Sequence, residues 1–212
     1  MATCVLFLDT ETTGLPDFKK PSDGPEQPHI VQLAAGLSEA PIDPRKKWQP
    51  IGSMDRIIRP DGWEMPEEAE AIHGISHARA VQEGIPIQQA LNEFLDLHDQ
   101  CNVLVAHNAA FDRRMLRIEL LRAGWTRDQI EEWEKPIRVI DTMREAGKIM
   151  RMAPTEAMVA AGRGSQNKPP KLTEAYQFFF GKEMEGAHDA MVDVRACAKI
   201  FFRLICDGSI VL

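Results

Sequence analysis

The sequence predicts an α/β fold in which a mixed β-sheet is flanked by α-helices. Three strand-like segments follow one another near the beginning of the chain, and two later strand-like segments alternate with helical ones. Successive strands joined by loops can pair antiparallel, whereas strands separated by helices favour parallel pairing through crossover connections. This order favours a mixed sheet over a doubly wound dinucleotide-binding sheet.

Five segments have the composition of β-strands. Residues 5–8 form an uninterrupted apolar run, which is typical of a strand buried on both faces. Residues 53–59 alternate less regularly between apolar and charged side chains. The expected strands comprise residues 5–8, 30–37, 53–59, 103–106 and 137–140, and we expect the first three to pair antiparallel.

Five further segments have the spacing of α-helices. Residues 67–72 follow Pro66, which suits a first helical turn, and Gly74 is typical of a helix end. Residues 87–97 carry apolar side chains at helical intervals. The expected helices comprise residues 67–72, 87–97, 111–122, 173–180 and 187–206.

The chain is expected to form a single domain over residues 1–212. Its 44% hydrophobic content can fill one core without disulfides or a structural metal. Two stretches rich in proline or glycine, residues 16–28 and 153–170, are expected to be surface loops. Residues 137–171 contain seven basic and three acidic side chains, which fits either a path for an anionic substrate or a solvated connection.

The composition also indicates a compartment and excludes some partners. The four cysteines form no C-x-x-C pair, which fits a reducing, intracellular environment. No apolar stretch approaches the roughly 18 to 20 residues that span a bilayer, and the N-terminus lacks a secretory leader pattern. We therefore expect a cytoplasmic protein with no membrane partner. The net charge of −7 argues against binding nucleic acid through a global basic field, but divalent cations can neutralise an acidic site locally.

Two segments that follow expected strands carry carboxylates. Asp9 and Glu11 are two residues apart on a strand, so both side chains leave the same face while Thr10 points away. Asp112 begins an expected helix directly after another buried strand. Alone, each has an ordinary explanation, because acids often end strands and favour first helical turns.

A third segment places His188 and Asp193 at the start of the last expected helix. A lone histidine there is usually a helix-start residue, so the third segment also carries little weight alone. His73 and His77 are four apart, as in zinc-binding helices, but Gly74 lies between them and no further ligand pair is evident.

Taken together and in order, the three segments resemble a known family. Asp-x-Glu after the first strand, His-Asn-x-x-Phe-Asp after the fourth and His-x-x-x-x-Asp at the last helix resemble the three motifs of the DnaQ-like, DEDDh family of 3′-5′ exonucleases. The resemblance extends to residues 12–15 and 72–75 and covers nearly the whole chain. The tyrosine variant of the superfamily is disfavoured, because Asp189 stands where it would have tyrosine. The resemblance implies an RNase H-like fold.

The resemblance also implies the chemistry. Two divalent cations, Mg²⁺ or Mn²⁺, would be held by carboxylate oxygens, which hard cations prefer. The implied metal ligands are Asp9, Glu11, Asp112 and Asp193. His188 would be the general base that takes a proton from water made more acidic by the cations. The five catalytic residues implied are therefore these four acids and His188.

The substrate contacts implied by the resemblance surround the same strand end. The backbone near Thr10 would meet the terminal 3′-hydroxyl, and Leu15 would pack against the terminal base. His73 and Ile75 resemble the loop that lines this pocket. The segment containing His107, Asn108 and Phe111 would support the second motif.

The leading hypothesis is an exonuclease that releases nucleoside 5′-monophosphates from single-stranded or frayed 3′ ends, with DNA favoured over RNA. RNA or short oligoribonucleotides are an open alternative, because the metal site contacts phosphate and does not identify the sugar. A catalytically silent binding or polymerase-accessory module is a second, although all five catalytic positions are occupied. An unrelated acid-rich α/β protein is a third. A replication or repair partner and the oligomeric state stay open.

Overall fold

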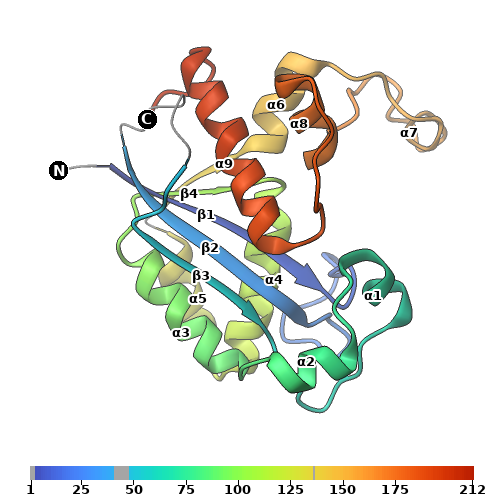
Figure 1. Ribbon diagram of the computed structural model, residues 1–212. Coiled ribbons are helices and arrows are strands. Elements are labelled where there is room, and N and C mark those ends of the chain that lie inside the picture. The colour runs from blue at the N-terminus through green and yellow to red at the C-terminus, as the bar shows by residue number, and fades with distance from the viewer. Residues whose placement is uncertain (1–2, 41–47, 136) are drawn as a thin grey trace.

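The computed structural model describes residues 3–40, 48–135 and 137–212 of the expected 1–212 domain. A five-stranded sheet with the order β3-β2-β1-β4-β5 lies between two layers of helices (Figure 1). The strands are β1 (Thr3–Thr12), β2 (Ile30–Ala40), β3 (Gly52–Ile57), β4 (Val103–Ala106) and β5 (Arg138–Asp141). The first three strands pair antiparallel, and β4 and β5 join them in parallel. The predicted mixed sheet with flanking helices is confirmed.

The central strand β1 buries both of its faces, which accounts for its uninterrupted apolar sequence. Val5 and Phe7 belong to one core cluster, whereas Leu6 and Leu8 belong to the cluster on the opposite face. Phe7 packs edge-to-face with Phe201, the ring centroids 5.3 Å apart. Such aromatic pairs contribute about 0.5 to 1.5 kcal/mol beyond the area that they bury.

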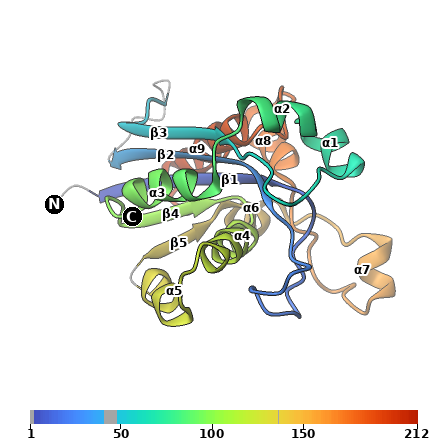
Figure 2. The same cartoon turned by 90° about the horizontal axis from the view of Figure 1, so that it is seen from below.

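Each face of the sheet has its own helices. The helices α6 (Thr142–Met150), α8 (Leu172–Phe180) and α9 (Ala190–Cys206) cover one face, and α3 (Ile87–His98), α4 (Ala109–Arg122) and α5 (Arg127–Glu134) cover the other (Figures 1 and 2). The short helices α1 (Glu67–His73) and α2 (His77–Glu83) lie near the end of the sheet where β1 finishes. None of the helices in the described part of the chain has the length and apolar character needed to cross a membrane.

The topology brings distant segments to one edge of the sheet. Because β1, β4 and β5 run parallel, their carboxyl ends lie at the same edge, where open α/β sheets commonly bind ligands. The end of β1 carries Asp9 and Glu11, and the segment after β4 leads into α4. The fold therefore places the predicted carboxylates at this edge.

Four helices were not predicted from the sequence, namely α2, α5, α6 and α7 (Glu156–Ala160). Helices α2 and α7 are too short to establish an apolar period. Helix α6 follows β5 without a turn, since Asp141 ends the strand and caps the helix. Helix α5 did have a signal, because Thr126 and Gln129 form a capping box.

Several predicted boundaries need correction. The expected loop at residues 153–170 contains α7, which is capped by Thr155. Residues 16–28 contain no helix or strand. The last helix begins at Ala190 instead of residue 187, because Asp189 is its N-cap and His188 has a positive φ of 69°. His188 therefore precedes the helix.

Candidate active site

The end of β1 presents side chains to both layers of the protein. Asp9 and Glu11 continue the face occupied by Val5 and Phe7, which is the face covered by α9. Thr10 points to the other face, and its Oγ1 donates a hydrogen bond of 2.9 Å to Asp112 Oδ1 at the start of α4. This bond joins residues that are 102 positions apart, and it locks the first carboxylate segment to the second.

The start of α9 supplies the third segment. Asp189 accepts hydrogen bonds from the backbone amides of Met191 and Val192, each 3.1 Å long, and so caps the helix. The backbone amide of Ala190 donates to Gln32 Oε1 on β2, which fixes the helix start against the sheet. With the cap in place, His188 lies just outside the helix and Asp193 in its first turn.

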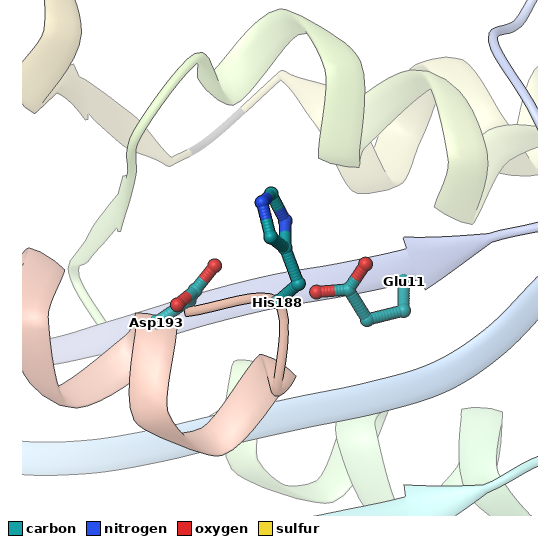
Figure 3. Close-up of side chains that lie close together, drawn as sticks. All are labelled: Glu11, His188 and Asp193. Carbon is teal, nitrogen blue, oxygen red and sulfur yellow. The ribbon is translucent and has the colours of Figure 1, made fainter. Parts of the chain in front are cut away.

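Glu11, His188 and Asp193 gather at one point (Figure 3). One potential ligand atom from each side chain lies within 4.8 Å of the others. In the view of Figure 3, the His188 side chain rises between the carboxylates of Asp193 and Glu11, and its ring lies above them. The three side chains come from β1, from the segment before α9 and from its first turn, so only the folded chain brings them together.

The clustered acids hold their protons more tightly than isolated carboxyl groups do. Burial, followed by the charges of Asp112, Asp193 and Glu11, raises the pKa of Asp9 well above its ordinary value. Burial and the neighbouring Asp193 raise the pKa of Glu11 to about 8. Burial also raises the pKa of Asp112 to about 7, although the hydrogen bond from Thr10 opposes this change.

The fourth acid behaves in the same way. Burial raises the pKa of Asp193 to about 7, and a hydrogen bond from the backbone of His188 opposes the change. Asp193 Oδ1 is buried and has no hydrogen-bond partner among the described residues. A buried oxygen without a donor is costly, and a hard divalent cation would satisfy it while relieving the repulsion among the acids. The residues present therefore fit divalent cations.

The raised pKa values predict how the metal-free protein responds to pH. The folded-state values of Glu11, Asp112 and Asp193 lie above the ordinary values of about 4, so the folded state binds extra protons between about pH 4 and 8. Stability then falls as pH rises through this window. In a chelator, we expect the Tm to fall from pH 5 to pH 8 by at least about 2 to 4 °C, which corresponds to about 1 kcal/mol.

Calorimetry with and without Mg²⁺ checks this expectation, and Glu11→Gln is the matched control. Added Mg²⁺ should raise the Tm more at pH 8 than at pH 5, and Glu11→Gln should flatten the decline in chelator. An unchanged slope in Glu11→Gln would show that other groups cause the pH dependence.

The buried His98 has the opposite effect on stability. Burial lowers its pKa, so the folded protein loses stability when this histidine must be protonated at low pH.

A cleft of about 390 Å³ opens over the carboxylates. This volume falls in the range of about 300 to 1,000 Å³ that is usual for small-ligand sites. All five predicted catalytic residues line it. The other lining residues are Thr10, Thr12, Thr13, Gly14, Leu15, Pro66, Glu68, Ala69, Ile72, His73, His107 and Phe111.

The wall of the cleft includes two exposed apolar side chains. Leu15 is 87% exposed and Ile72 is 58% exposed. The loop that carries Leu15 is held in shape, because Thr12 Oγ1 donates a 2.8 Å hydrogen bond to the Gly14 carbonyl oxygen. Ile72 belongs to the segment 72–75 to which the family resemblance extends, but the resemblance assigned it no contact with the substrate. An apolar group held in water beside a cleft suits a planar ligand such as a nucleobase.

Two of the predicted substrate-binding residues do not line this cleft. Ile75 is buried and packs with Val31 and Ala80. Asn108 begins α4 in a left-handed conformation, and its backbone amide donates to Asp141 Oδ1. Ile75 and Asn108 are therefore neighbours of cleft residues in the sequence, but the structure places them outside the cleft.

The two cleft histidines other than His188 have defined partners. His73 Nδ1 accepts a hydrogen bond of 3.0 Å from the Ile75 amide, so neutral His73 carries its proton on Nε2. His107 Nε2 lies 3.0 Å from the Pro170 carbonyl oxygen, which can only accept, so this nitrogen donates. His107 Nδ1 lies 3.0 Å from the Thr142 hydroxyl oxygen, which is also 3.2 Å from the Ala106 carbonyl oxygen. Both ring nitrogens of His107 are thus used inside the protein.

Comparison with protein families matches residues 6–201 to the family RNase_T, described as Exonuclease. Comparison with curated protein sequences finds no match.

Solved structures share the fold. A zinc-bound complex of *E. coli* ExoI with single-stranded DNA has a TM-score of 0.69 at 19% identity and covers 98% of this chain. The nuclease domain of 3′hExo, a DEDDh family member bound to rAMP, has a TM-score of 0.65 at 15% identity and covers 98% of this chain. Exonuclease I from *Methylocaldum szegediense* has a TM-score of 0.65 at 22% identity and covers 95%.

The share of each neighbour that is covered differs. This chain spans 41% of the *E. coli* protein and 40% of the *Methylocaldum* protein, but 94% of the 3′hExo nuclease domain. The likeness confirms the RNase H-like fold expected from the sequence.

Proposed function

This chain belongs to the RNase_T exonuclease family, and we propose that it is a metal-dependent 3′-5′ exonuclease. It hydrolyses single-stranded or frayed 3′ ends and releases nucleoside 5′-monophosphates. The observation that carries the proposal is the convergence of four carboxylates and His188 at the floor of one cleft, from three segments of the chain.

The proposed cations are two Mg²⁺ or Mn²⁺ ions. Asp9, Glu11, Asp112 and Asp193 would hold them, and the unpartnered Asp193 Oδ1 supports this assignment. When bound, such cations neutralise phosphate charge and make water a better nucleophile. Their charge also replaces the protons that the clustered acids would otherwise keep at neutral pH.

His188 has the position of a proton acceptor in this proposal. It directly precedes the capped start of α9, and one of its ring nitrogens lies within 4.8 Å of a carboxylate oxygen of Glu11 and of Asp193. A base must lie within hydrogen-bond reach of the proton that it removes, either directly or through one water. Thr10 holds Asp112 in place and keeps the second carboxylate segment aligned with the first.

The apolar wall of the cleft is proposed to hold the terminal base. Leu15→Ala should raise KM by roughly tenfold, because a leucine side chain contributes about 1.5 to 3 kcal/mol when it is fully buried, and contact with a base buries part of it. Because Leu15 is 87% exposed in the free protein, its truncation should change stability by no more than about 0.5 kcal/mol. Steady-state kinetics and thermal melts measure the two effects.

Ile51→Ala is the matched control for Leu15→Ala. Ile51 is 60% exposed and lies just before β3, at the opposite end of the sheet from the cleft. The Ile51→Ala substitution should leave KM unchanged. A large loss of stability in Leu15→Ala with unchanged KM would mean that Leu15 supports the loop instead of the base.

Digestion of labelled oligonucleotides tests the proposal directly. Matched DNA and RNA strands carry a label at the 5′ end in one set and at the 3′ end in the other, with Mg²⁺ or Mn²⁺ present. We expect the 3′ label to be released first, as a mononucleotide, and the 5′-labelled strand to shorten stepwise. Release of the 5′ label first, internal cleavage, or no cleavage with either metal would contradict the proposal.

The same digestion distinguishes the sugar. The structural neighbours bind both kinds of nucleic acid: E. coli ExoI forms a complex with single-stranded DNA, and a 3′-exonuclease recognises a histone mRNA stem-loop. We propose DNA as the principal substrate of this chain, with RNA or oligoribonucleotides as the alternative. A higher kcat/KM on the RNA strand would select the alternative.

A further inference from the structure

An arm consisting of residues 151–171 extends from the body of the protein and carries α7. Most of its side chains are exposed, and Met158 and Pro170 are the buried exceptions. Figure 1 shows the arm leaving the end of α6, projecting beyond the helical layer and returning to α8. The catalytic arrangement described above uses none of the side chains of the arm.

The root of the arm is attached to the wall of the cleft. The Lys168 amide donates to the Met152 carbonyl oxygen at 3.0 Å, which closes the arm at its base. His107 lines the cleft and donates to the Pro170 carbonyl oxygen at 3.0 Å. A Cβ added at Gly147 of α6 would lie 3.5 Å from Pro170, so the C-terminal segment of the arm also packs on α6.

The arm is basic in a chain whose net charge is −7. Its only acid is Glu156, and Lys168 is neutralised by an ion pair with Glu174 of α8. Arg151, Arg163 and Lys171 are exposed, and no carboxylate in the described part of the chain pairs with them. These three cations are therefore available to an anionic ligand.

The arm lies where it can contact a nucleic-acid strand that leaves the cleft. In Figure 2, α1 and the arm project from the same end of the sheet on opposite sides of the end of β1. Helix α1 supplies Ala69, Ile72 and His73 to one wall of the cleft, and His107 links the arm to another. The cleft of about 390 Å³ suits a single nucleotide, so the rest of a bound strand must pass over the surface outside it.

We propose that the arm binds the phosphates of the strand on the 5′ side of the nucleotide in the cleft, through Arg151, Arg163 and Lys171. This inference rests on the proposed function. The arm increases the efficiency of the enzyme on long strands and has no effect on a dinucleotide, whose single phosphate lies at the carboxylates.

The test compares two substrates that share a 3′ sequence, a dinucleotide and a strand of about 20 nucleotides. Each phosphate contact on a single strand contributes a slope of about −0.7 to a plot of log affinity against log salt, so the loss of three contacts should reduce the slope by about 2. For the triple variant Arg151→Gln/Arg163→Gln/Lys171→Gln, kcat/KM on the long strand should fall by about tenfold to a hundredfold at low salt. On the dinucleotide, kcat/KM should not change.

Three further variants separate the effect of local contacts from the effects of net charge and of protein stability. Lys135→Gln/Arg203→Gln removes two exposed cations at the ends of α5 and α9, which do not line the cleft, and should leave both substrates unaffected. Arg151 has a positive φ of 46°, which glycine adopts more easily at a helix end. Arg151→Gly should therefore keep or raise the Tm while lowering kcat/KM on the long strand. Arg151→Lys should keep kcat/KM on the long strand close to that of the wild type.

Equal losses on both substrates, no loss on the long strand, or an equal loss in the control double variant would each overturn the proposal. Binding of the long strand in Ca²⁺, measured by fluorescence anisotropy, separates this result from the proposed function. If the wild type binds the strand but hydrolyses nothing in Mg²⁺ or Mn²⁺, the exonuclease assignment fails. In that case the proposal for the arm is tested by binding alone. It stands if the triple variant binds the long strand more weakly and with a smaller salt dependence than the wild type, and it fails if neither quantity changes.

Discussion

Asp9→Asn should lower the rate of phosphodiester hydrolysis by at least about 10³-fold, more than the about 10- to 100-fold typical of residues that only support a metal ligand. Asp9 lines the same cleft as Asp112, Asp193 and Glu11, and the charges of all three raise its pKa. Replacing it with a neutral group of the same shape removes this repulsion. The Tm of the metal-free variant should therefore equal or exceed that of the wild type.

Single-turnover kinetics and thermal melts in chelator measure the two quantities, and Asp189→Asn is the matched control. Asp189 also raises the pKa of Asp9, but its side chain caps α9. Asparagine caps helices about as well as aspartate, so this variant removes a neighbouring charge and keeps the helix start. Its rate should remain close to that of the wild type. Wild-type turnover by Asp9→Asn would refute the assignment of Asp9 as a metal ligand.

His188→Gln should lower the rate by roughly 10² to 10⁴, the range usual for a positioned general base, while substrate and metal binding are largely kept. Glutamine can still form hydrogen bonds at this position but cannot accept the proton. Because His188 lies before the capped start of α9, its replacement should not disturb the helix. Rate measurements at saturating Mg²⁺ and substrate isolate the effect on the chemical step.

The structure also allows His188 to be a metal ligand instead of a base. One of its ring nitrogens and one carboxylate oxygen each from Glu11 and Asp193 all lie within 4.8 Å of one another. Mn²⁺ affinity, measured by titration calorimetry, distinguishes the two roles. A base leaves the affinity of the variant close to that of the wild type, whereas a metal ligand lowers it and excess metal restores part of the rate. An unchanged rate in His188→Gln would require another proton acceptor.

Much of the fold and the core of the site could be predicted because the relevant signals are local. The apolar run of β1 reports burial on both faces, and a spacing of two places Asp9 and Glu11 on one side of a strand. The three carboxylate segments and their order were sufficient for the family resemblance, and the family match covers residues 6–201. Helices α2 and α7 were missed because one or two turns contain too few residues to show a period.

The sequence by itself predicted the mixed sheet, because the order of its strand-like and helical segments is a local signal, and the resemblance of its three carboxylate segments to a known family implied the five residues that line the cleft. Tertiary structure alone decided which neighbours face the cleft. Leu15 and Ile75 are both apolar residues that follow a glycine, yet Leu15 is 87% exposed and Ile75 is 2% exposed. The difference arises because Ile75 packs in one buried cluster with Val31, which is distant in sequence, as well as with the nearby Ala80. The link from His107 to Pro170 likewise spans 63 positions, and only the folded chain brings the two together.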